Sequence, residues 1–307
     1  MSGMDASIVI VVKNGGDNFP RLLERIYSQQ FNGSYEVIVI DSGSTDGTLD
    51  AARRYPVILR EIAPAEFHHS RTRNLGLNMA TGEYVVFITS DALPLDDRWL
   101  DRLTAGFTDR STAMTVGRQI AWQKTKPPEK FFYKSNFPEF KIMVKSGAAD
   151  YYHYNVFISN VNAAYRRDIL LKYKFDEQLV LAEDKEIAAR FLKGGYSIIY
   201  EPEAAVYHSH NEGLSDLFNK HLDFGLANRQ GVGELPKTAG NVLSGTAGYV
   251  GSELKYLAEN RLWQWVPYVL VYEAVKYAGL WLGKTGILKG PTARSAKRNH
   301  ERTISIS

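Results

Sequence analysis

The segment Ser7-Ile-Val-Ile-Val-Val12, followed by Lys13 and Asn14, decides the fold class. A continuous run of apolar, mostly β-branched residues is typical of a strand that is covered on both faces. Two similar runs follow it, Glu36-Val-Ile-Val-Ile40 and Tyr84-Val-Val-Phe-Ile-Thr89. Strands of this kind are typical of a sheet with helices packed on both sides.

Helical patterns separate these strands. A first helix is predicted after Asn18, a plausible N-cap, with Pro20 in its first turn and an apolar face that includes Leu22 and Ile26. Further helices are predicted over residues 46–54 and 70–79, with another strand over 57–62. The alternation of strand and helix predicts an α/β fold with a mostly parallel central sheet flanked by helices.

The second half of the chain is less regular. Residues 124–149, rich in Lys, Pro and aromatic residues, are predicted to form a long loop. Strands are expected over 156–164 and 197–200, the latter ending at Glu201-Pro202, and a helix over 183–193. From Leu214 the pattern is helical, with a glycine-rich break over 231–251. We therefore predict two domains, residues 1–212 and a helical extension over 213–307.

Composition restricts the class of protein. Of 307 residues, 44% are hydrophobic and 23% charged, which predicts a folded chain with a sizeable core. The net charge of +3 does not indicate binding to nucleic acid. With no cysteine, disulfides and thiolate metal sites are excluded, and a reducing, cytoplasmic location fits. No signal peptide is recognisable, and polar residues interrupt the apolar stretch 263–283, so we expect no membrane-spanning helix.

Polar clusters follow three of the predicted strands. They are Lys13-Asn14, the segment from Asp41 to Asp46, and Ser90-Asp91. Ligands of open parallel sheets bind beyond the carboxyl ends of the strands, where these clusters would converge. For each cluster alone, the alternative interpretation is an ordinary turn with a helix cap. This alternative is less favoured when three clusters share one crevice.

The segment Asp41-Ser-Gly-Ser-Thr-Asp-Gly-Thr48 contains neither a GxGxxG nor a GxxxxGK[ST] pattern. A dinucleotide fingerprint and a Walker A phosphate loop are therefore absent from it. An acidic residue directly after the strand is placed to accept hydrogen bonds from a nucleobase or from ribose hydroxyls. A pyrophosphate would then need a metal ion and basic residues to balance its charge.

The stretches Ser7–Asn14 and Val37–Thr48 resemble the opening of the second family of inverting glycosyltransferases, which has the GT-A fold. The resemblance covers roughly residues 7–212 and departs from the usual pattern at Ser42, where Asp is commoner. The rhamnosyltransferase branch of the family has similar segments, which here are Phe67–Gly76, Phe87–Pro94 and Glu201–His210.

This resemblance implies transfer of a sugar from a nucleoside-diphosphate donor to a cell-surface glycan or a lipid-linked acceptor. The rhamnosyltransferase branch implies L-rhamnose from dTDP-rhamnose, with a UDP- or GDP-sugar as the alternative. The residues expected to bind the nucleotide sugar lie after the strands and at the start of the helix after the third strand: Val12, Lys13, Asn14, Asp41, Ser42, Arg71, Arg73, Asn74 and Ser90. A solvated basic face is the alternative for Arg71.

The family usually places an Asp-x-Asp metal-binding motif at the end of the fourth strand. The matching triplet here is Thr89-Ser90-Asp91, so the resemblance implies Asp91 as the ligand of Mg²⁺ or Mn²⁺. His208 matches a histidine that related enzymes place at the metal, with His210 as the weaker choice. A structural histidine is the alternative for His208.

Inverting transfer needs a base for the proton of the acceptor hydroxyl. Asp184 should point inward because it shares a helical face with Ile187 and Phe191, and the start of a helix favours its ionised form. The resemblance also implies Asp184 as the base, with Glu183 binding the acceptor or orienting the loop. A helix cap with a solvated glutamate is the alternative.

The C-terminal region combines apolar helical segments with a basic end. Residues 284–307 contain six Lys or Arg and one Glu. This pattern favours attachment to an anionic membrane surface, at the inner face of the cell membrane, whereas a homo-oligomer interface or packing on the main domain is the alternative. Two rival functions remain: a nucleotidyltransferase, whose basic glycine-rich loop is poorly matched here, and a non-catalytic nucleotide-sugar-binding module.

Overall fold

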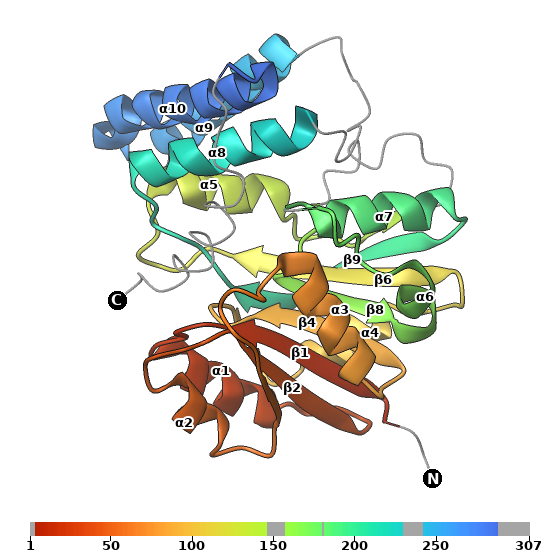
Figure 1. Ribbon diagram of the computed structural model, residues 1–307. Helices are drawn as coiled ribbons and strands as arrows, with labels where there is room; N and C mark the ends of the chain where they lie inside the picture. Colours follow the sequence, from red (N-terminus) through yellow and green to blue (C-terminus); the bar gives the residue numbers. More distant parts are fainter. Residues whose placement is uncertain (1–3, 146–156, 180, 230–241, 288–307) are drawn as a thin grey trace. The chain divides into compact units, whose positions relative to one another are not determined.

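The computed structural model describes residues 4–145, 157–179, 181–229 and 242–287 (Figure 1). By contacts between residues the chain divides into two compact units. Within the described ranges, unit 1 contains residues up to 120 and residues 137–208, and unit 2 contains 121–136 and 209–287. The division into domains at residue 212 stays a prediction.

Unit 1 is built on one mixed sheet. In the described residues its strand order is β3-β2-β1-β4-β8-β6-β9-β5, and β7 pairs with β9. The strands are β1 Ala6–Val12, β2 Tyr35–Asp41, β3 Ile58–Glu61, β4 Tyr84–Thr89, β5 Leu93–Pro94, β6 Thr112–Ile120, β7 Ile142–Val144, β8 Asn162–Arg166 and β9 Ser197–Tyr207. Strands β1 to β4 pair in parallel, whereas β8 is antiparallel to both β4 and β6.

Helices flank this sheet, which confirms the predicted α/β class (Figure 1). They are α1 Asn18–Tyr27, α2 Thr48–Ala52, α3 His69–Met79, α4 Trp99–Ala105, α6 Arg167–Tyr173 and α7 Glu183–Lys193. The first helix begins at Asn18 itself, after Asp17.

The apolar run of β1 is explained by cores on both faces of the sheet. Ile8 and Ile10 are fully buried in a cluster with Leu22 of α1 and other residues of α1 and α4. Val9 points the other way, toward α3, where a Cβ on Gly76 would collide with its side chain. Since successive side chains of a strand face opposite sides, a strand between two helical layers must be apolar throughout.

Two expectations for the second half are wrong. The predicted loop over 124–149 contains helix α5, Pro127–Asn136, and strand β7, while residues 146–149 lie outside the described part. Pro127 and Pro128 are tolerated in the helix because the first turn needs no backbone donors, and Phe131 and Tyr133 are buried. Helix α4 and strand β6 were also not anticipated.

Strand β9 continues to Tyr207 instead of ending at Glu201-Pro202. Its pairing with β6 shifts in register between Gly117 and Gln119, which lie opposite Glu201 and Val206. A bulge of this kind lets a strand accommodate a proline that cannot donate a hydrogen bond. The expected strand over 156–164 begins at Asn162, and residue 156 lies outside the described part.

Unit 2 is helical and confirms the expected C-terminal helices. It contains α5, α8 Leu214–Arg229, α9 Val242–Glu259, a 3₁₀ turn at Trp263–Trp265 and α10 Val266–Thr285. The expected glycine-rich break is wrong over residues 242–251, which belong to α9, while its remainder, 231–241, and the basic tail, 288–307, lie outside the described residues. Of the helices that are described, none has both the length and the apolarity needed to cross a bilayer.

Candidate active site

The carboxyl ends of β1, β2 and β4 bring the predicted polar clusters together. Val12 lies beside Asp41 in the sheet, and Val11 lies beside Thr89 on the other side of β1. Lys13, Ser42 and Ser90, which follow these strand ends, therefore start neighbouring loops. Ser42 and Ser90 are buried and Lys13 is half-buried.

Asp41 is buried and its carboxylate organises the loop that follows it. Its Oδ1 accepts hydrogen bonds from the backbone N–H groups of Gly43 and Ser44, both at 2.9 Å, and its Oδ2 accepts from the Ser44 hydroxyl. Gly43 adopts a left-handed conformation with φ 89°, which glycine tolerates without strain. A carboxylate that follows a strand thus builds a tight turn from its own neighbours.

The loops after β1 and β2 are also bound to each other. Asn14, at φ 49°, donates its N–H to the Ser44 hydroxyl at 2.7 Å and accepts from the N–H of Thr45 at 2.7 Å. Asp46 accepts the N–H groups of Gly16 and Thr48. Burial opposes ionisation of Asp46, but these hydrogen bonds outweigh it and lower the pKa of that carboxyl.

A second group of charged residues gathers where α7 begins. Arg73 of α3 donates to Glu183 at 2.7 Å, and the exposed fractions of the two side chains are 13% and 7%. Burial tends to raise the pKa of Glu183, but the positive charge of Arg73 prevails and lowers it. Burial and Arg73 lower the pKa of His69 to about 4. Glu183 is therefore an ionised carboxylate in a buried ion pair.

Asp184 behaves differently from its neighbour. Its Oδ2 accepts the backbone N–H of Asn160 at 3.2 Å, and its Oδ1 accepts the N–H of Lys185 at 2.8 Å. Burial first, and then the negative charge of Glu183, raise the pKa of Asp184 to about 6. A carboxyl with this pKa can accept a proton near neutral pH and still be ionised beforehand.

The residue before this pair has an unusual backbone. Ala182, the N-cap of α7, adopts a left-handed conformation with φ 64°. A residue with a Cβ pays about 1–2 kcal/mol for this conformation. The turn at Ala182 directs the chain so that Glu183 and Asp184 both begin the helix.

Asn160 and Tyr165 belong to this group although the sequence analysis does not name them. The Asn160 amide donates to Glu183 at 3.2 Å, and its Oδ1 accepts from the hydroxyl of Tyr165 at 2.6 Å. Both residues are buried. Asn160 thus holds Glu183 through its side chain and Asp184 through its backbone. The two carboxylates it holds are more than 20 residues away in sequence, and no local pattern marks it.

Two predicted binding residues lie apart from these contacts. The Asn74 side chain donates to the Phe175 carbonyl at 2.9 Å, accepts the Phe175 N–H at 3.0 Å, and donates to Glu177 at 3.0 Å. Its amide therefore fastens α3 to the segment before α7. Arg71 is exposed and lies 3.5 Å from Glu177.

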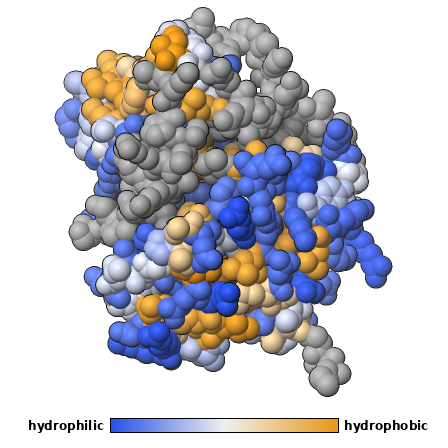
Figure 2. Space-filling view, viewed as in Figure 1, coloured by the Kyte–Doolittle hydropathy of each residue, from blue (hydrophilic) through white to orange (hydrophobic). Residues whose placement is uncertain are grey.

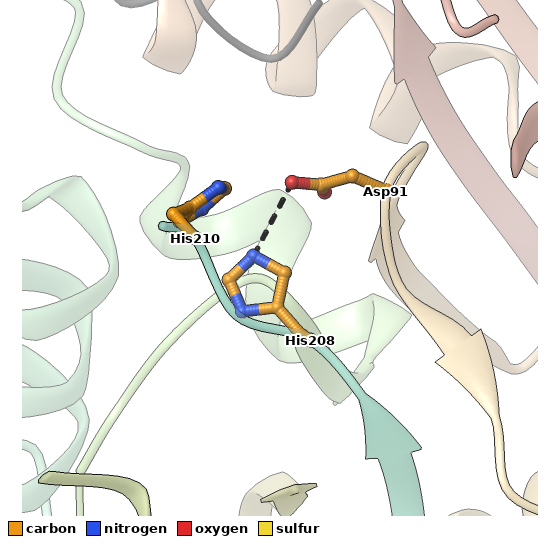
Figure 3. A group of neighbouring side chains, drawn as sticks. All are labelled: Asp91, His208 and His210. Atoms are coloured by element: carbon orange, nitrogen blue, oxygen red, sulfur yellow. Dashed lines mark ion pairs between the residues drawn. The ribbon is translucent and has the colours of Figure 1, made fainter. Parts of the chain in front are cut away.

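The third group contains the predicted metal ligands. His208 Nε2 lies 3.4 Å from an Asp91 carboxylate oxygen, and both side chains are largely buried (Figure 3). His208 Nδ1 lies 3.0 Å from Oε1 of Gln119, which can accept a hydrogen bond from a protonated Nδ1. One ligand atom each of Asp91, His208 and His210 lies within 4.8 Å of the others.

This donor set fits a divalent cation. A carboxylate oxygen and imidazole nitrogens suit Mn²⁺ and related metals, and Mg²⁺ prefers the oxygen ligands. A hydrogen bond to the second ring nitrogen is the usual means by which proteins orient a ligating histidine, and Gln119 is placed to provide it. The position of Thr89 supplies no second carboxylate.

Residues 7–174 match the family described as glycosyl transferase family 2, and the chain belongs to that family. It is 33% identical over 261 residues to the O-antigen chain rhamnosyltransferase WbaN of Salmonella anatum, covering 84% of this chain and 82% of the relative. It is 31% identical over 287 residues to the O-antigen chain rhamnosyltransferase RfbN of Salmonella typhimurium, covering 92% and 90%.

Solved structures show the same fold at lower sequence identity. The mannosyltransferase PcManGT of Pyrobaculum calidifontis, in complex with GDP-Man and Mn²⁺, superposes with a TM-score of 0.61 at 18% identity, over 91% of this chain and 87% of that one. TarS 1-349 of S. aureus, in complex with UDP, gives a TM-score of 0.55 at 19% identity, over 92% and 91%. The resemblance of this chain to GT-A glycosyltransferases of the rhamnosyltransferase branch is thereby confirmed.

Proposed function

We propose that the protein is a metal-dependent, inverting glycosyltransferase that moves L-rhamnose from dTDP-rhamnose to a cell-surface glycan or a lipid-linked acceptor. The observation that carries the reaction is the Asp184 carboxyl, whose pKa burial and Glu183 raise to about 6. The rhamnose donor is supported by the two relatives described as O-antigen chain rhamnosyltransferases.

The reaction is a direct displacement at the anomeric carbon. Asp184 takes the proton of the acceptor hydroxyl while the acceptor oxygen forms a bond to that carbon. The bond from the carbon to the phosphate oxygen breaks, and its electron pair leaves with the nucleoside diphosphate. Asp91 and His208 would hold a divalent cation. Its positive charge would stabilise the negative charge of the departing diphosphate.

The donor is assigned to the ends of β1 and β2, to the loops after β1, β2 and β4, and to the beginning of α3. We assign its nucleotide and sugar to Val12, Lys13, Asn14, Asp41, Ser42, Arg71, Arg73, Asn74 and Ser90. Among these, Arg73 also holds Glu183, and this ion pair supports an orienting role for Glu183 in preference to a direct contact with the acceptor. Such a pair keeps the first turn of α7 fixed while the neighbouring Asp184 changes its protonation.

The donor is tested by thermal unfolding in the presence of dTDP, dTDP-rhamnose, UDP-sugars and GDP-sugars, each with and without Mg²⁺ or Mn²⁺. A ligand that binds the native state raises the midpoint as its concentration exceeds its Kd. We expect metal-dependent stabilisation by dTDP-rhamnose, and its loss in Asp91→Ala. A preference for UDP- or GDP-sugars would keep the enzyme class and reject rhamnose. No response to any nucleotide would reject the proposal.

A non-catalytic nucleotide-sugar-binding module is the alternative function. It would retain the donor loops without needing a base. Asp184→Asn distinguishes the two, because a transferase should keep donor binding and lose transfer.

A further inference from the structure

Helix α10 presents an apolar face to solvent. Pro267, Leu270, Val271, Ala274, Ala278 and Trp281 are exposed and recur at helical spacing along its length. The exposed fractions are 50% for Leu270, 49% for Val271 and 59% for Trp281. Figure 2 shows apolar residues gathered at the upper left, where Figure 1 places α10. No charged residue interrupts this face before Lys284.

The inward face of α10 carries the charges instead. Glu273 is 4% exposed and forms an ion pair with Lys276 at 2.6 Å. The Lys276 ammonium group also lies 4.6 Å from the ring centroid of Tyr249 in α9. A helix on the surface of a soluble unit normally turns its apolar side inward and its charges outward. In α10 the outer face is apolar, while the buried side holds this charged pair next to Val269 and Tyr272, so the outer face is suited to an apolar environment.

Close packing on α8 fixes which face points outward. A Cβ on Gly279 or Gly283 of α10 would collide with backbone atoms of Phe218 or Leu222 in α8, and a Cβ on Gly225 of α8 would collide with the backbone of α10. The glycines let the two helices approach closely, and α10 cannot rotate its apolar face inward without breaking this contact. The exposed face is therefore part of the folded unit.

We propose that this face of α10 docks on an anionic lipid surface. Two observations favour lipid over a second protein. Tryptophans with exposed fractions of 63% and 59%, Trp263 and Trp281, lie near the two ends of the face, and tryptophan is enriched where proteins meet the membrane interface. The sequence from Lys284 to the C-terminus has six Lys or Arg and one Glu. Basic residues that follow an apolar helix in the sequence complement anionic headgroups.

Lipid docking goes beyond the proposed transfer reaction and does not depend on the identity of the donor. A helix that lies in the interface needs both an apolar face and electrostatic attraction for stable attachment, and this chain offers both. Membrane attachment would bring the enzyme close to acceptors carried by lipids.

The test is flotation of the full-length protein with vesicles of phosphatidylcholine alone or mixed with phosphatidylglycerol. We expect binding to the mixed vesicles only, weakened by salt, and reduced at least tenfold in the double variant Leu270→Glu/Trp281→Glu. The matched control is Phe140→Glu in unit 1, which removes another exposed aromatic side chain and should bind like the wild type. Unchanged unfolding midpoints would show that the variants are folded.

Three outcomes would overturn the proposal. They are equal binding to both vesicle types, undiminished binding of the double variant, and absence of binding by the wild type. Sedimentation equilibrium without vesicles tests whether a second copy of the chain covers this face instead. A wild-type dimer that dissociates in the double variant, combined with absence of vesicle binding, would assign the face to a second copy. Stabilisation by nucleotides, measured on the same variants, separates failure of this proposal from failure of the proposed reaction.

Discussion

The loop after β2 and the start of α7 both place a carboxylate at the candidate site, but they hold it in opposite ways. Asp41 accepts its hydrogen bonds from Gly43 and Ser44, two and three residues away. Asp184 accepts one from Asn160, and its neighbour Glu183 is held by Arg73, 110 residues away. The first arrangement is built by a local turn, whereas the second depends on the folded sheet.

The two arrangements suit different roles: ligand binding for Asp41 and proton transfer for Asp184. A carboxylate that several neighbouring donors fix in place, as in Asp41, suits a group that holds a ligand. Asp184, next to a buried negative charge, has a pKa raised to about 6, which suits a group that must take a proton. Variants of the two carboxylates should therefore fail in different assays.

The largest effect is expected for Asp184→Asn. The amide keeps the size of the side chain but cannot accept the proton, so transfer should fall by about 10²–10⁴-fold, the usual contribution of a general base. Donor binding, measured by calorimetry, should be retained. Asp50→Asn, at a side chain that is 76% exposed, is the matched control and should be fully active. Transfer at the wild-type rate in Asp184→Asn would reject the base.

Asp41→Ala should affect stability as well as donor binding. It leaves the partly buried N–H groups of Gly43 and Ser44 without their acceptor, at a cost of about 1 kcal/mol in the free energy of unfolding. Urea unfolding measures this loss, with Asp50→Ala as the control that should change little. An unaltered urea midpoint would mean that the turn does not need the carboxylate.

Gln119→Met tests whether a distant contact also orients the metal ligands. The substitution keeps the volume but removes the acceptor at His208 Nδ1, and loss of such a contact typically lowers metal affinity about 10–100-fold. Titration of Mn²⁺ in the presence of the nucleotide measures it. Gln123→Met, at an exposed position, is the control. Equal affinity in both variants would remove Gln119 from the site.

The pH dependence of kcat/KM should show the raised pKa of Asp184 in the free enzyme. Asp184 must be ionised to act as a base, so activity is present above its pKa of about 6 and is lost as the pH falls through that value. Below pH 6, kcat/KM should fall about tenfold per pH unit. A kcat/KM that stays constant from pH 7 to pH 5 would contradict the assignment.

The smallest effect is expected for Tyr165→Phe, which removes the hydroxyl that binds Asn160. It should reduce the free energy of unfolding by about 1 kcal/mol and lower kcat several-fold with little change in the KM of the donor. Tyr200→Phe is the matched control. The Tyr200 hydroxyl also donates a hydrogen bond to a carbonyl oxygen, that of Pro138, but Tyr200 lies in β9 and Tyr165 in β8. If both variants lose stability and keep the same kcat, Asn160 does not position the base.

The same contrast explains what the sequence could predict. The limits of β4 and α7 agree with the predicted ones because apolar periodicity and turn residues are local signals. A single sequence does not show which distant residues become neighbours. It therefore does not predict the contacts of Asn160 with Glu183 and Asp184, or that of Gln119 with His208. The nearer contact of Tyr165 with Asn160 has no sequence pattern that marks it. Helix α5 was missed because its Lys, Pro and aromatic residues were interpreted as those of a loop.

The backbone of Ala182 has a further consequence. Glycine would adopt this left-handed conformation with less strain, but it would also enlarge the set of conformations open to the unfolded chain. With alanine, the segment before α7 has fewer alternatives to the one that aims Glu183 and Asp184 at their partners. The methyl group of Ala182 thus adds local strain but reduces the number of conformations of the unfolded chain, so the orientation of Asp184 is specified partly through conformational entropy.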